Sequence, residues 1–301
     1  MLAISTTWKY NPHTILKGFL AEIKDLGLDS IEVGYDFTPE RLDELASLLA
    51  NFAIKIASVH NFCPLSGENL FKRFYTDYYR LSSLNEDERS LAVLATKKTI
   101  DTALRLGARI VVIHAGVVEI DRSYTRNILS MYRDGKAGTK EYENAKEELL
   151  RVRDIKKVAY VGAVIRSLEE ILAYAKMYQI KIGLECRYYP EEIPNLEEAD
   201  YLLKMFSSGG LVYWHDMGHA QVQENLGFVS HLAYLERLSG YLYGFHVHDV
   251  QGLHDHMAPF TGMIDMDRIM AYMKPDTLRV IEAHPPASIQ EIKNALVRLS
   301  V

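Results

Sequence analysis

Short stretches of apolar and β-branched residues alternate along the chain with longer stretches in which apolar residues recur every three or four positions. The short stretches are typical of buried strands, and the longer ones of amphipathic helices. Strands are expected at eight places, residues 2–6, 30–35, 55–60, 109–116, 181–187, 211–218, 241–249 and 279–284. Several of the helical stretches between them end in glycine, as in KDLG at 24–27 and ALRLG at 103–107, which favours a helix stop.

This alternation of strand and helix predicts an α/β fold, a parallel sheet covered by helices. Eight strand–helix units favour a closed (β/α)8 TIM barrel that occupies residues 1–301 as a single domain. The alternative is an open, doubly wound sheet, whose nucleotide-binding versions have a glycine-rich turn after a strand. Neither GxGxxG nor GxxxxGK[ST] follows any expected strand, so we favour the barrel.

Two long insertions interrupt the alternation. One covers about residues 61–90, and the other covers about residues 117–158 and is rich in Lys, Arg and Glu. Both follow the C-terminal end of an expected strand, and in a TIM barrel this is the active-site face. We therefore expect the insertions to form a lid or a wall around a substrate. The alternative for the charged stretch is a helix exposed to solvent.

Six of the eight expected strands close with a side chain that can bind a metal. Such a group at the end of an apolar strand points into the bowl above the barrel core. A buried carboxylate costs several kcal/mol unless it is paired or metal-bound, so six such ends are hard to explain as core residues. The six residues are His60, His114, Glu185, Asp216, His246 and Glu282.

The last four of these residues suggest one metal site. Two glutamates, an aspartate and a histidine form a hard, oxygen-rich ligand set with a single imidazole. This set suits Mn²⁺, Mg²⁺, Co²⁺ or Zn²⁺ and does not choose among them. His246 opens the segment HVHDVQGLHDH at 246–256, and His248 lies two positions further along the same strand face, where it would meet a substrate.

Composition narrows the cellular context and the partners. The chain has 34 Lys and Arg against 40 Asp and Glu, a net charge of −6, so it has no overall attraction for nucleic acid or anionic membranes. No apolar run is long enough to span a bilayer, and the N-terminus lacks the pattern of a signal peptide. Cys63 and Cys186 lie far apart, which fits a reducing compartment. We expect a cytoplasmic protein.

The strand-end motifs resemble those of the xylose isomerase-like TIM barrels, which include sugar isomerases, ketose 3-epimerases, inosose dehydratases and endonuclease IV. They are SVH at 58–60, VVIHAG at 111–116, LE at 184–185, DMGH at 216–219, FHVHD at 245–249 and IEA at 281–283. The resemblance implies one divalent metal on Glu185, Asp216, His246 and Glu282. It also implies a small carbohydrate substrate, a sugar or a sugar phosphate, and it makes a homo-oligomer possible.

For the sugar enzymes, the resemblance implies an isomerase or epimerase that acts through an enediolate. Glu185 and Glu282 would be the catalytic pair that exchanges protons with the substrate carbon. His219 would form a hydrogen bond to a substrate oxygen. Arg187 and Glu191, in the stretch RYYPEE, are secondary candidates for hydroxyl or phosphate contacts, with a surface loop as the alternative. An inosose-type metal-dependent dehydratase would use the same metal site.

The alternative within this superfamily is a phosphodiesterase like endonuclease IV, which holds up to three zinc ions. Five histidines could bind substrate or additional metal, and all but His254 lie at positions that match that family: His60, His114, His219, His254 and His256. His254 replaces the aspartate of that family's Asp-x-His motif, although Asp255 could serve in its place. After His246 the sequence is VHD where the family has LND, and DMGH replaces DTCH. No strong basic groove is visible, so nucleic acid is an unlikely partner. We therefore favour the sugar enzyme, with His254 and His256 as the residues that separate the two hypotheses.

Overall fold

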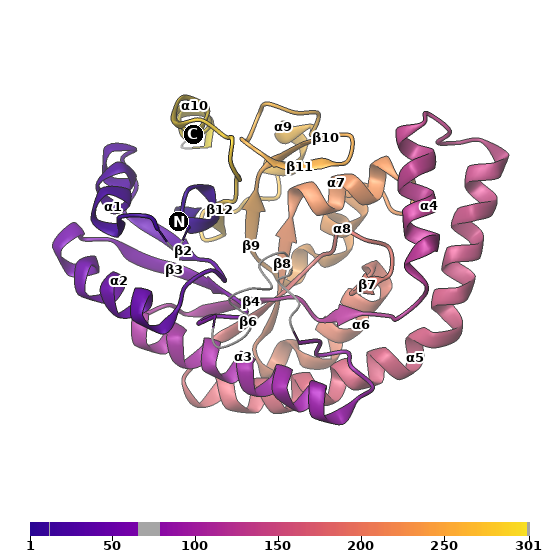
Figure 1. Cartoon of the computed structure of the whole chain (residues 1–301), viewed down its shortest axis with the longest axis horizontal. Helices are drawn as coiled ribbons and strands as arrows, with labels where there is room; N and C mark the ends of the chain where they lie inside the picture. Colours follow the sequence, from indigo (N-terminus) through magenta and orange to yellow (C-terminus); the bar gives the residue numbers. More distant parts are fainter. Residues whose placement is uncertain (12, 66–78, 300–301) are drawn as a thin grey trace.

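Eight parallel strands close into a barrel in the computed structural model, which describes residues 1–11, 13–65 and 79–299 (Figure 1). Around the barrel the order is β1-β12-β9-β8-β6-β4-β3-β2. Each of the eight expected strands is present, which confirms the predicted (β/α)8 barrel. The strands are β1 Leu2–Ser5, β2 Ser30–Val33, β3 Lys55–His60, β4 Ile110–Ile113, β6 Lys181–Glu185, β8 Leu211–Asp216, β9 Leu242–Val247 and β12 Leu278–Ile281.

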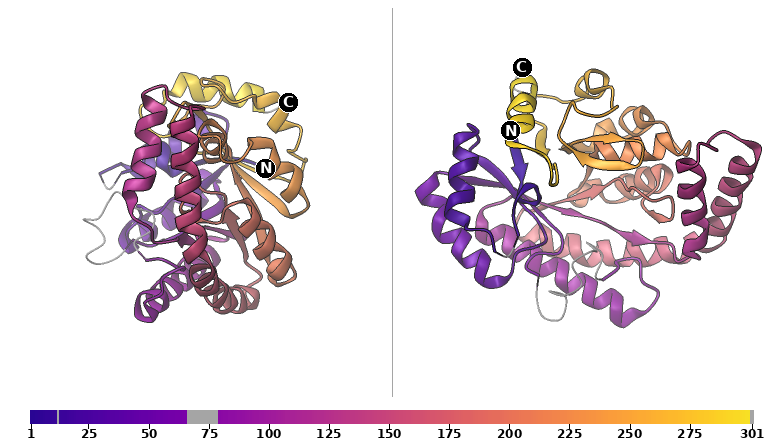
Figure 2. Two further views of the ribbon diagram at one scale, coloured as in Figure 1. Left: turned by 90° about the vertical axis from the view of Figure 1, so that its right-hand side faces the viewer. Right: turned by 45° about the horizontal axis from the view of Figure 1, so that its top comes forward.

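Helices surround the barrel on its outside (Figure 2). Local sequence sets several of their ends. The Thr38 hydroxyl accepts a hydrogen bond from the Arg41 amide at the start of α2, and Gly107 ends α3 in the left-handed conformation at φ 78°, as its position predicts. The helices are α1 Leu16–Asp25, α2 Pro39–Phe52, α3 Glu86–Leu106, α4 Arg122–Arg133, α5 Lys140–Met177, α6 Leu196–Phe206, α7 Met217–Asn225, α8 His231–Leu238, α9 Met266–Met270 and α10 Ile289–Leu299.

The inside of the barrel is filled by side chains rather than being a pore. A small apolar cluster there is separate from the larger core between strands and helices. Its largest member, Trp214, fits because glycines face it from both neighbouring strands: a Cβ on Gly244 would lie 2.3 Å from the indole, and one on Gly183 3.4 Å from it. The Trp214 ring lies 5.2 Å from that of His246, so the indole forms the floor beneath the strand-end residues.

The second expected insertion becomes a helical hairpin that extends sideways from the barrel (Figure 1). It consists of α4 and the N-terminal part of α5. The charged stretch runs without a break into the barrel helix that follows, and together they form α5, one continuous helix of 38 residues. Of the first expected insertion, residues 66–78 lie outside the described residues, and residues 86–90 already belong to α3.

Two short antiparallel strand pairs lie in loops at the C-terminal end of the barrel strands. β5 (Gly116–Val117) pairs with β7 (Glu192–Ile193), and β10 (Asp249–Gln251) pairs with β11 (His254–Met257). Both pairs come from loops that follow barrel strands, so they build the walls above the strand ends. No helix in the described part of the chain has the length and apolar composition needed to cross a membrane.

Candidate active site

The four predicted metal ligands converge at one place. Glu185 ends β6, Asp216 ends β8, His246 lies near the end of β9, and Glu282 directly follows β12. Their ligand atoms all lie within 4.8 Å of one another, and all four residues are buried. They meet because β6, β8, β9 and β12 are consecutive neighbours in the barrel, and Asp216 and His246 are in register.

The electrostatics of this cluster suit a cation. His246 Nδ1 lies 3.2 Å from a Glu185 oxygen, 3.0 Å from a Glu282 oxygen and 3.6 Å from an Asp216 oxygen. Burial alone would lower the pKa of His246, but the carboxylates, Glu282 first, outweigh it and raise this pKa well above its usual value. The protonated imidazole of His246 then supplies a positive charge that offsets the negative charge of these carboxylates. A divalent metal fits the same donors, because three carboxylates and one imidazole are a suitable ligand set.

Glu32 is a functional candidate that sequence analysis missed. It lies in β2, fully buried, and its two carboxylate oxygens are 3.2 and 3.1 Å from His246 Nε2. Ser58 Oγ donates a hydrogen bond of 2.7 Å to the same carboxylate. Glu32 therefore accepts a hydrogen bond from His246 Nε2 and leaves Nδ1 directed at the three carboxylates of the cluster. The sequence signal was a lone carboxylate inside the apolar stretch SIEV, within the strand expected at 30–35, and in the structure Glu32 is the next-to-last residue of β2.

Replacing Glu32 with Gln is expected to weaken binding of a divalent metal by about 10–100-fold, the usual effect of losing a carboxylate behind a ligating histidine. The fold should persist because Gln has nearly the same shape and its amide oxygen can still accept a hydrogen bond from His246 Nε2. Titration calorimetry with Mn²⁺ or Zn²⁺ measures the affinity, with the exposed Glu44→Gln as a matched control. Unchanged affinity in Glu32→Gln would show that Glu32 does not orient His246.

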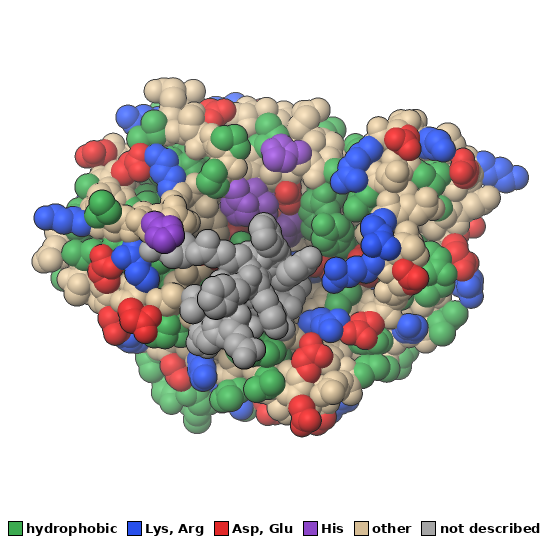
Figure 3. Space-filling view, in the orientation of Figure 1, with side chains coloured by type: hydrophobic (Ala, Val, Ile, Leu, Met, Phe, Trp, Pro, Cys, Tyr) green, Lys and Arg blue, Asp and Glu red, His purple; other side chains and the backbone are tan. Residues whose placement is uncertain are grey.

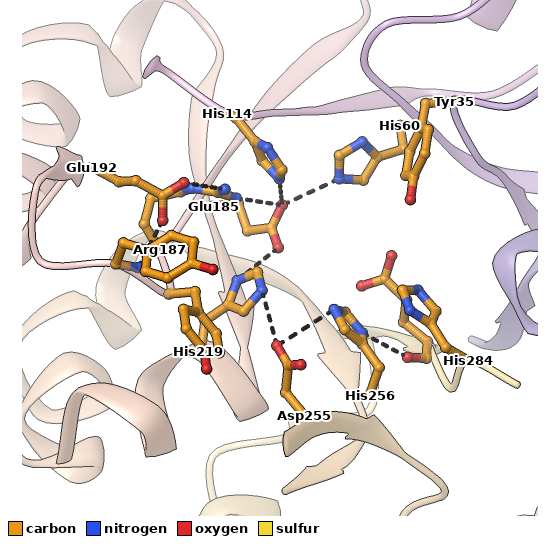
Figure 4. Close-up of a pocket in the computed structure, with 13 residues that line it drawn as sticks. Tyr35, His60, His114, Glu185, Arg187, Glu192, His219, Asp255, His256 and His284 are labelled. Carbon is orange, nitrogen blue, oxygen red and sulfur yellow. Dashed lines mark hydrogen bonds and ion pairs between the residues drawn. The ribbon is translucent and has the colours of Figure 1, made fainter. Parts of the chain in front are cut away.

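Two further groups of possible ligands adjoin this cluster (Figure 4). His60 and His114 lie 3.3 and 3.0 Å from the Oε2 oxygen of Glu185. Across the pocket, a carboxylate oxygen of Asp255 lies 3.8 Å from His219 Nε2 and 3.6 Å from His256 Nε2. The structure thus brings together four of the five histidines that were predicted to bind substrate or extra metal.

A cavity of about 280 Å³ opens above these groups. This volume is near the lower end of small-molecule sites, roughly 300–1,000 Å³, so it suits a compact ligand. Of the four clustered ligands, Glu185 and Glu282 line the cavity, whereas Asp216 and His246 lie beneath it. The complete lining is Tyr35, His60, His114, Glu185, Arg187, Tyr188, Tyr189, Glu192, His219, Asp255, His256, Glu282 and His284.

The secondary candidates have different positions. Arg187 lines the cavity, and its Nη2 donates to Glu192 Oε1 at 2.7 Å. Glu191 points instead toward α4, where it accepts a hydrogen bond of 2.6 Å from the Thr125 hydroxyl, and burial raises its pKa. Glu191 therefore contacts the helical hairpin and does not line the cavity, which differs from the expected substrate contact.

His248 is also placed differently from the prediction of a substrate contact. It is fully buried, and its Nε2 lies 2.9 Å from Asp216 Oδ1. Burial alone would lower its pKa, but Asp216 outweighs this and raises the pKa to about 9. The reason for its burial is Gly218 at the start of α7: a Cβ there would lie 2.1 Å from the imidazole. His248 therefore packs against Asp216, one of the four predicted ligands, and does not line the cavity.

His254 is not brought into the site. It is exposed and does not line the cavity, and Asp255 occupies the place that the prediction gave to His254. The cause is the backbone of His256, whose φ of 53° breaks the strand alternation, so that the consecutive side chains Asp255 and His256 both face His219. Sequence alternation alone would pair His254 with His256.

The closed parallel barrel defines a TIM-barrel protein, and its strand-end carboxylates and imidazoles form a cluster that could bind a metal. The chain belongs to the xylose isomerase-like TIM barrel family, which matches residues 20–293. A comparison with curated proteins finds no significant match.

Solved structures with the same fold include several sugar epimerases. A D-tagatose 3-epimerase-like protein is 20% identical, with a TM-score of 0.68 over 99% of this chain and 95% of its own. D-psicose 3-epimerase from Clostridium cellulolyticum H10, solved with D-tagatose, is 14% identical, with a TM-score of 0.66 over 99% and 98%. The IolI protein, solved with a zinc atom, is 19% identical, with a TM-score of 0.68 over 99% and 97%. At these identities the likeness shows the fold.

Proposed function

We propose that this protein is a divalent-metal-dependent isomerase or epimerase of sugars. One observation carries the proposal: Glu185 and Glu282 belong to the cluster of four possible metal ligands and also line the cavity. They come from β6 and from the end of β12, which are separated in the barrel by β8 and β9. Two carboxylates that reach a small substrate from different sides are what proton removal and proton return at a carbon require.

The charge states of the two glutamates support this chemistry. Burial alone would raise the pKa of Glu185, but His114 and His246 outweigh it and hold the pKa well below its usual value. Burial alone would also raise the pKa of Glu282, but His246 outweighs it and lowers the pKa of this carboxyl. Both side chains are therefore ionised near neutral pH and able to accept a proton.

The reaction follows from these groups. One carboxylate removes the proton from the carbon beside the sugar carbonyl. In an epimerase, the other glutamate takes up a proton from water and gives it to the opposite face of the same carbon, and the first carboxyl then releases its proton to water. In an isomerase, the first carboxyl returns the proton to the second carbon, and the other glutamate moves a proton between the two oxygens. When bound, a divalent cation supplies positive charge that stabilises the enediolate oxygens. The side chains of His60, His219 and Tyr35 face the cavity as hydrogen-bond partners for hydroxyl groups.

Deuterium exchange tests the proposal. Metal-loaded protein in D2O should introduce deuterium beside the carbonyl of at least one ketose in a panel of ketopentoses and ketohexoses, detected by proton NMR. EDTA treatment should abolish the exchange, and Mn²⁺, Co²⁺, Mg²⁺ or Zn²⁺ should restore it. A dehydratase would begin with the same proton removal but release water, which mass spectrometry of the product detects. Absence of exchange with every sugar would contradict the proposal.

A second candidate is a zinc phosphodiesterase like endonuclease IV, and one observation favours it. The groups His60–His114–Glu185 and His219–Asp255–His256 could each hold a further metal beside the central cluster. Elemental analysis of the purified protein distinguishes the two functions. We expect about one divalent ion per chain, whereas three zinc ions together with cleavage of abasic-site DNA would favour the phosphodiesterase.

A further inference from the structure

One wall of the cavity is formed by residues 187–192, the segment that follows β6. Arg187, Tyr188, Tyr189 and Glu192 of this segment line the cavity. The segment lies against the helical hairpin of α4 and α5, which is to the right of the hollow in which histidines are visible (Figure 3). No described residue of the hairpin lines the cavity itself, so the hairpin can act on the site only through this wall.

A buried arginine of α5 connects the hairpin to the wall. Arg153 is 1% exposed, and its Nη1 and Nη2 each donate a hydrogen bond of 2.7 Å to the carboxylate of Glu198, in the first turn of α6. Its Nη2 also donates to the main-chain carbonyl of Glu192 at 2.9 Å. One planar guanidinium, whose N–H directions are fixed, therefore holds the start of α6 and the end of the wall together.

The side chain of Glu192 extends this connection to the cation in the cavity. Its Oε1 accepts a hydrogen bond of 2.7 Å from Arg187 Nη2 (Figure 4). Its Oε2 accepts a hydrogen bond of 2.7 Å from the Tyr189 amide, so both carboxylate oxygens have a partner within the wall. The main chain of Glu192, which Arg153 binds, therefore decides where the Arg187 guanidinium lies.

The start of the wall has a different support. Gln223 of α7 donates from its Nε2 to the carbonyls of Tyr188 at 2.8 Å and Arg187 at 3.3 Å. These bonds hold the main chain of Arg187, but its guanidinium lies at the end of a long, flexible side chain. The ion pair with Glu192, and behind it Arg153, is what directs this guanidinium.

The Arg187 guanidinium lies between two carboxylates of the cavity. Glu192 is on one side, and on the other Nη1 lies 4.0 Å from Oε2 of Glu185, one of the two glutamates proposed to transfer protons. Among the described lining residues, Arg187 is the single Arg or Lys. A guanidinium only donates hydrogen bonds, so it is a suitable partner for hydroxyl oxygens of a sugar held beside Glu185.

We propose that Arg153 is a positioning residue of the sugar site: through Glu192, it holds the Arg187 guanidinium in the place where Arg187 binds hydroxyl groups of the substrate. The inference rests on the proposed function and gives the inserted hairpin a role as a fixed support behind the cavity wall. Lysine in place of Arg153 keeps the charge, but a compact ammonium without the planar fork cannot hold the Glu198 carboxylate and the Glu192 carbonyl in the same geometry.

Ketose binding to the metal-loaded full chain tests the inference, measured by titration calorimetry with fructose, tagatose and ribulose. Arg187→Met should weaken binding of the tightest ketose by about tenfold or more, because a charged hydrogen-bond donor is lost. Arg153→Lys should weaken it by about threefold or more, and should have no further effect when Arg187→Met is already present. Equal effects of Arg153→Lys with and without Arg187→Met would overturn the inference.

Arg89→Lys is the matched control. Arg89 is buried like Arg153, joins α3 to α5 through an ion pair of 3.0 Å with Glu170, and does not line the cavity. This variant should lose thermal stability and keep the wild-type affinity for ketoses. Equal losses of ketose affinity in Arg89→Lys and Arg153→Lys would show a general effect of destabilisation and overturn the inference.

Glu192→Gln tests the same connection without disturbing the buried ion pair. Arg153 and Glu198 keep their contacts in this variant, so it should fold even if Arg153→Lys does not. Loss of the Glu192 charge should weaken its hold on Arg187 and lower ketose affinity by about threefold or more, again with no further effect beside Arg187→Met. Wild-type affinity in folded Glu192→Gln would overturn the inference.

Exchange kinetics separate positioning from catalysis. Arg187 is expected to bind the sugar equally well before and during proton transfer. Arg153→Lys should therefore raise the KM for deuterium exchange and leave the rate at saturating ketose within about twofold of the wild type. A lower saturated rate with an unchanged KM would overturn the inference.

The same measurements separate this inference from the proposed function. Ketose binding that depends on Arg153 through Arg187, without deuterium exchange by the wild type, would support the inference and overturn the isomerase proposal. Exchange that is insensitive to Arg153→Lys and to Glu192→Gln would support the isomerase and overturn the inference. Absence of binding with every ketose would overturn both.

Discussion

Replacement of Glu282 with Gln is expected to lower deuterium exchange into the sugar by about 10²–10⁴-fold, the range that a general acid or base contributes. The carboxylate lies at the cavity wall, and one of its oxygens is 3.0 Å from His246 Nδ1. Gln keeps the size and one ligating oxygen but cannot accept a proton from carbon. Exchange rates are measured by NMR at saturating metal, so that weaker metal binding is not mistaken for loss of the base.

Two measurements make this result specific. The exposed Glu236→Gln on α8 is the control and should exchange at the wild-type rate. Metal content of Glu282→Gln is determined on the same sample. If the variant holds metal and exchanges at an undiminished rate, Glu282 is not one of the two proton-transferring groups, and the assignment of the catalytic pair is wrong.

Replacement of Asp216 with Asn is expected to remove the metal-dependent part of the thermal stability and leave a folded protein. Asp216 Oδ1 accepts the His219 amide hydrogen bond at 2.7 Å, which caps α7, and also lies 2.9 Å from His248 Nε2. Asn can still cap the helix but lacks the charge that a metal ligand needs here. Metal at 100 times its dissociation constant stabilises the native state by about 2.7 kcal/mol. This metal-dependent stabilisation should be absent in Asp216→Asn.

The alanine variant separates the roles of Asp216. Asp216→Ala should lose about 1 kcal/mol more, because the α7 cap is lost as well. Thermal unfolding with EDTA and with excess metal measures both effects. Asp121→Asn is a matched control, because Asp121 caps α4 by accepting the Ser123 amide at 2.8 Å and lies outside the cluster. A full metal-dependent shift in Asp216→Asn would show that Asp216 is not a ligand.

The barrel and its central cluster could be predicted from sequence because both depend on local patterns. Alternating strand and helix stretches indicated the eight barrel strands, and the parallel arrangement brings all strand C-terminal ends to one face. Glu185, Asp216 and His246 close such strands, so naming the strand ends was enough to predict that they meet. Cys186, one position beyond Glu185, is not part of the cluster, and its thiol donates to the Asp216 carbonyl.

The cavity wall could not be predicted in this way. Glu32 reaches His246 through contacts between residues 214 positions apart, and it lies inside a strand where a sequence pattern indicates only burial. The path of the loops decides that Tyr188 and Glu192 face the cavity and that Glu191 does not. Such positions depend on packing between loops, which no periodicity in the sequence encodes.

The histidine-rich segment at 246–256 contains one residue whose place the sequence predicts and others whose place depends on tertiary packing. Sequence alone determined that His246 is the strand-end residue of β9, because strand period and barrel topology place it there. Only the tertiary structure decided the others: Gly218 leaves the space in which His248 packs against Asp216, and the left-handed backbone of His256 turns Asp255 toward His219 and leaves His254 exposed. Periodicity predicts which way a regular strand points, whereas a turn and a close helix contact are settled by the space that the folded chain leaves.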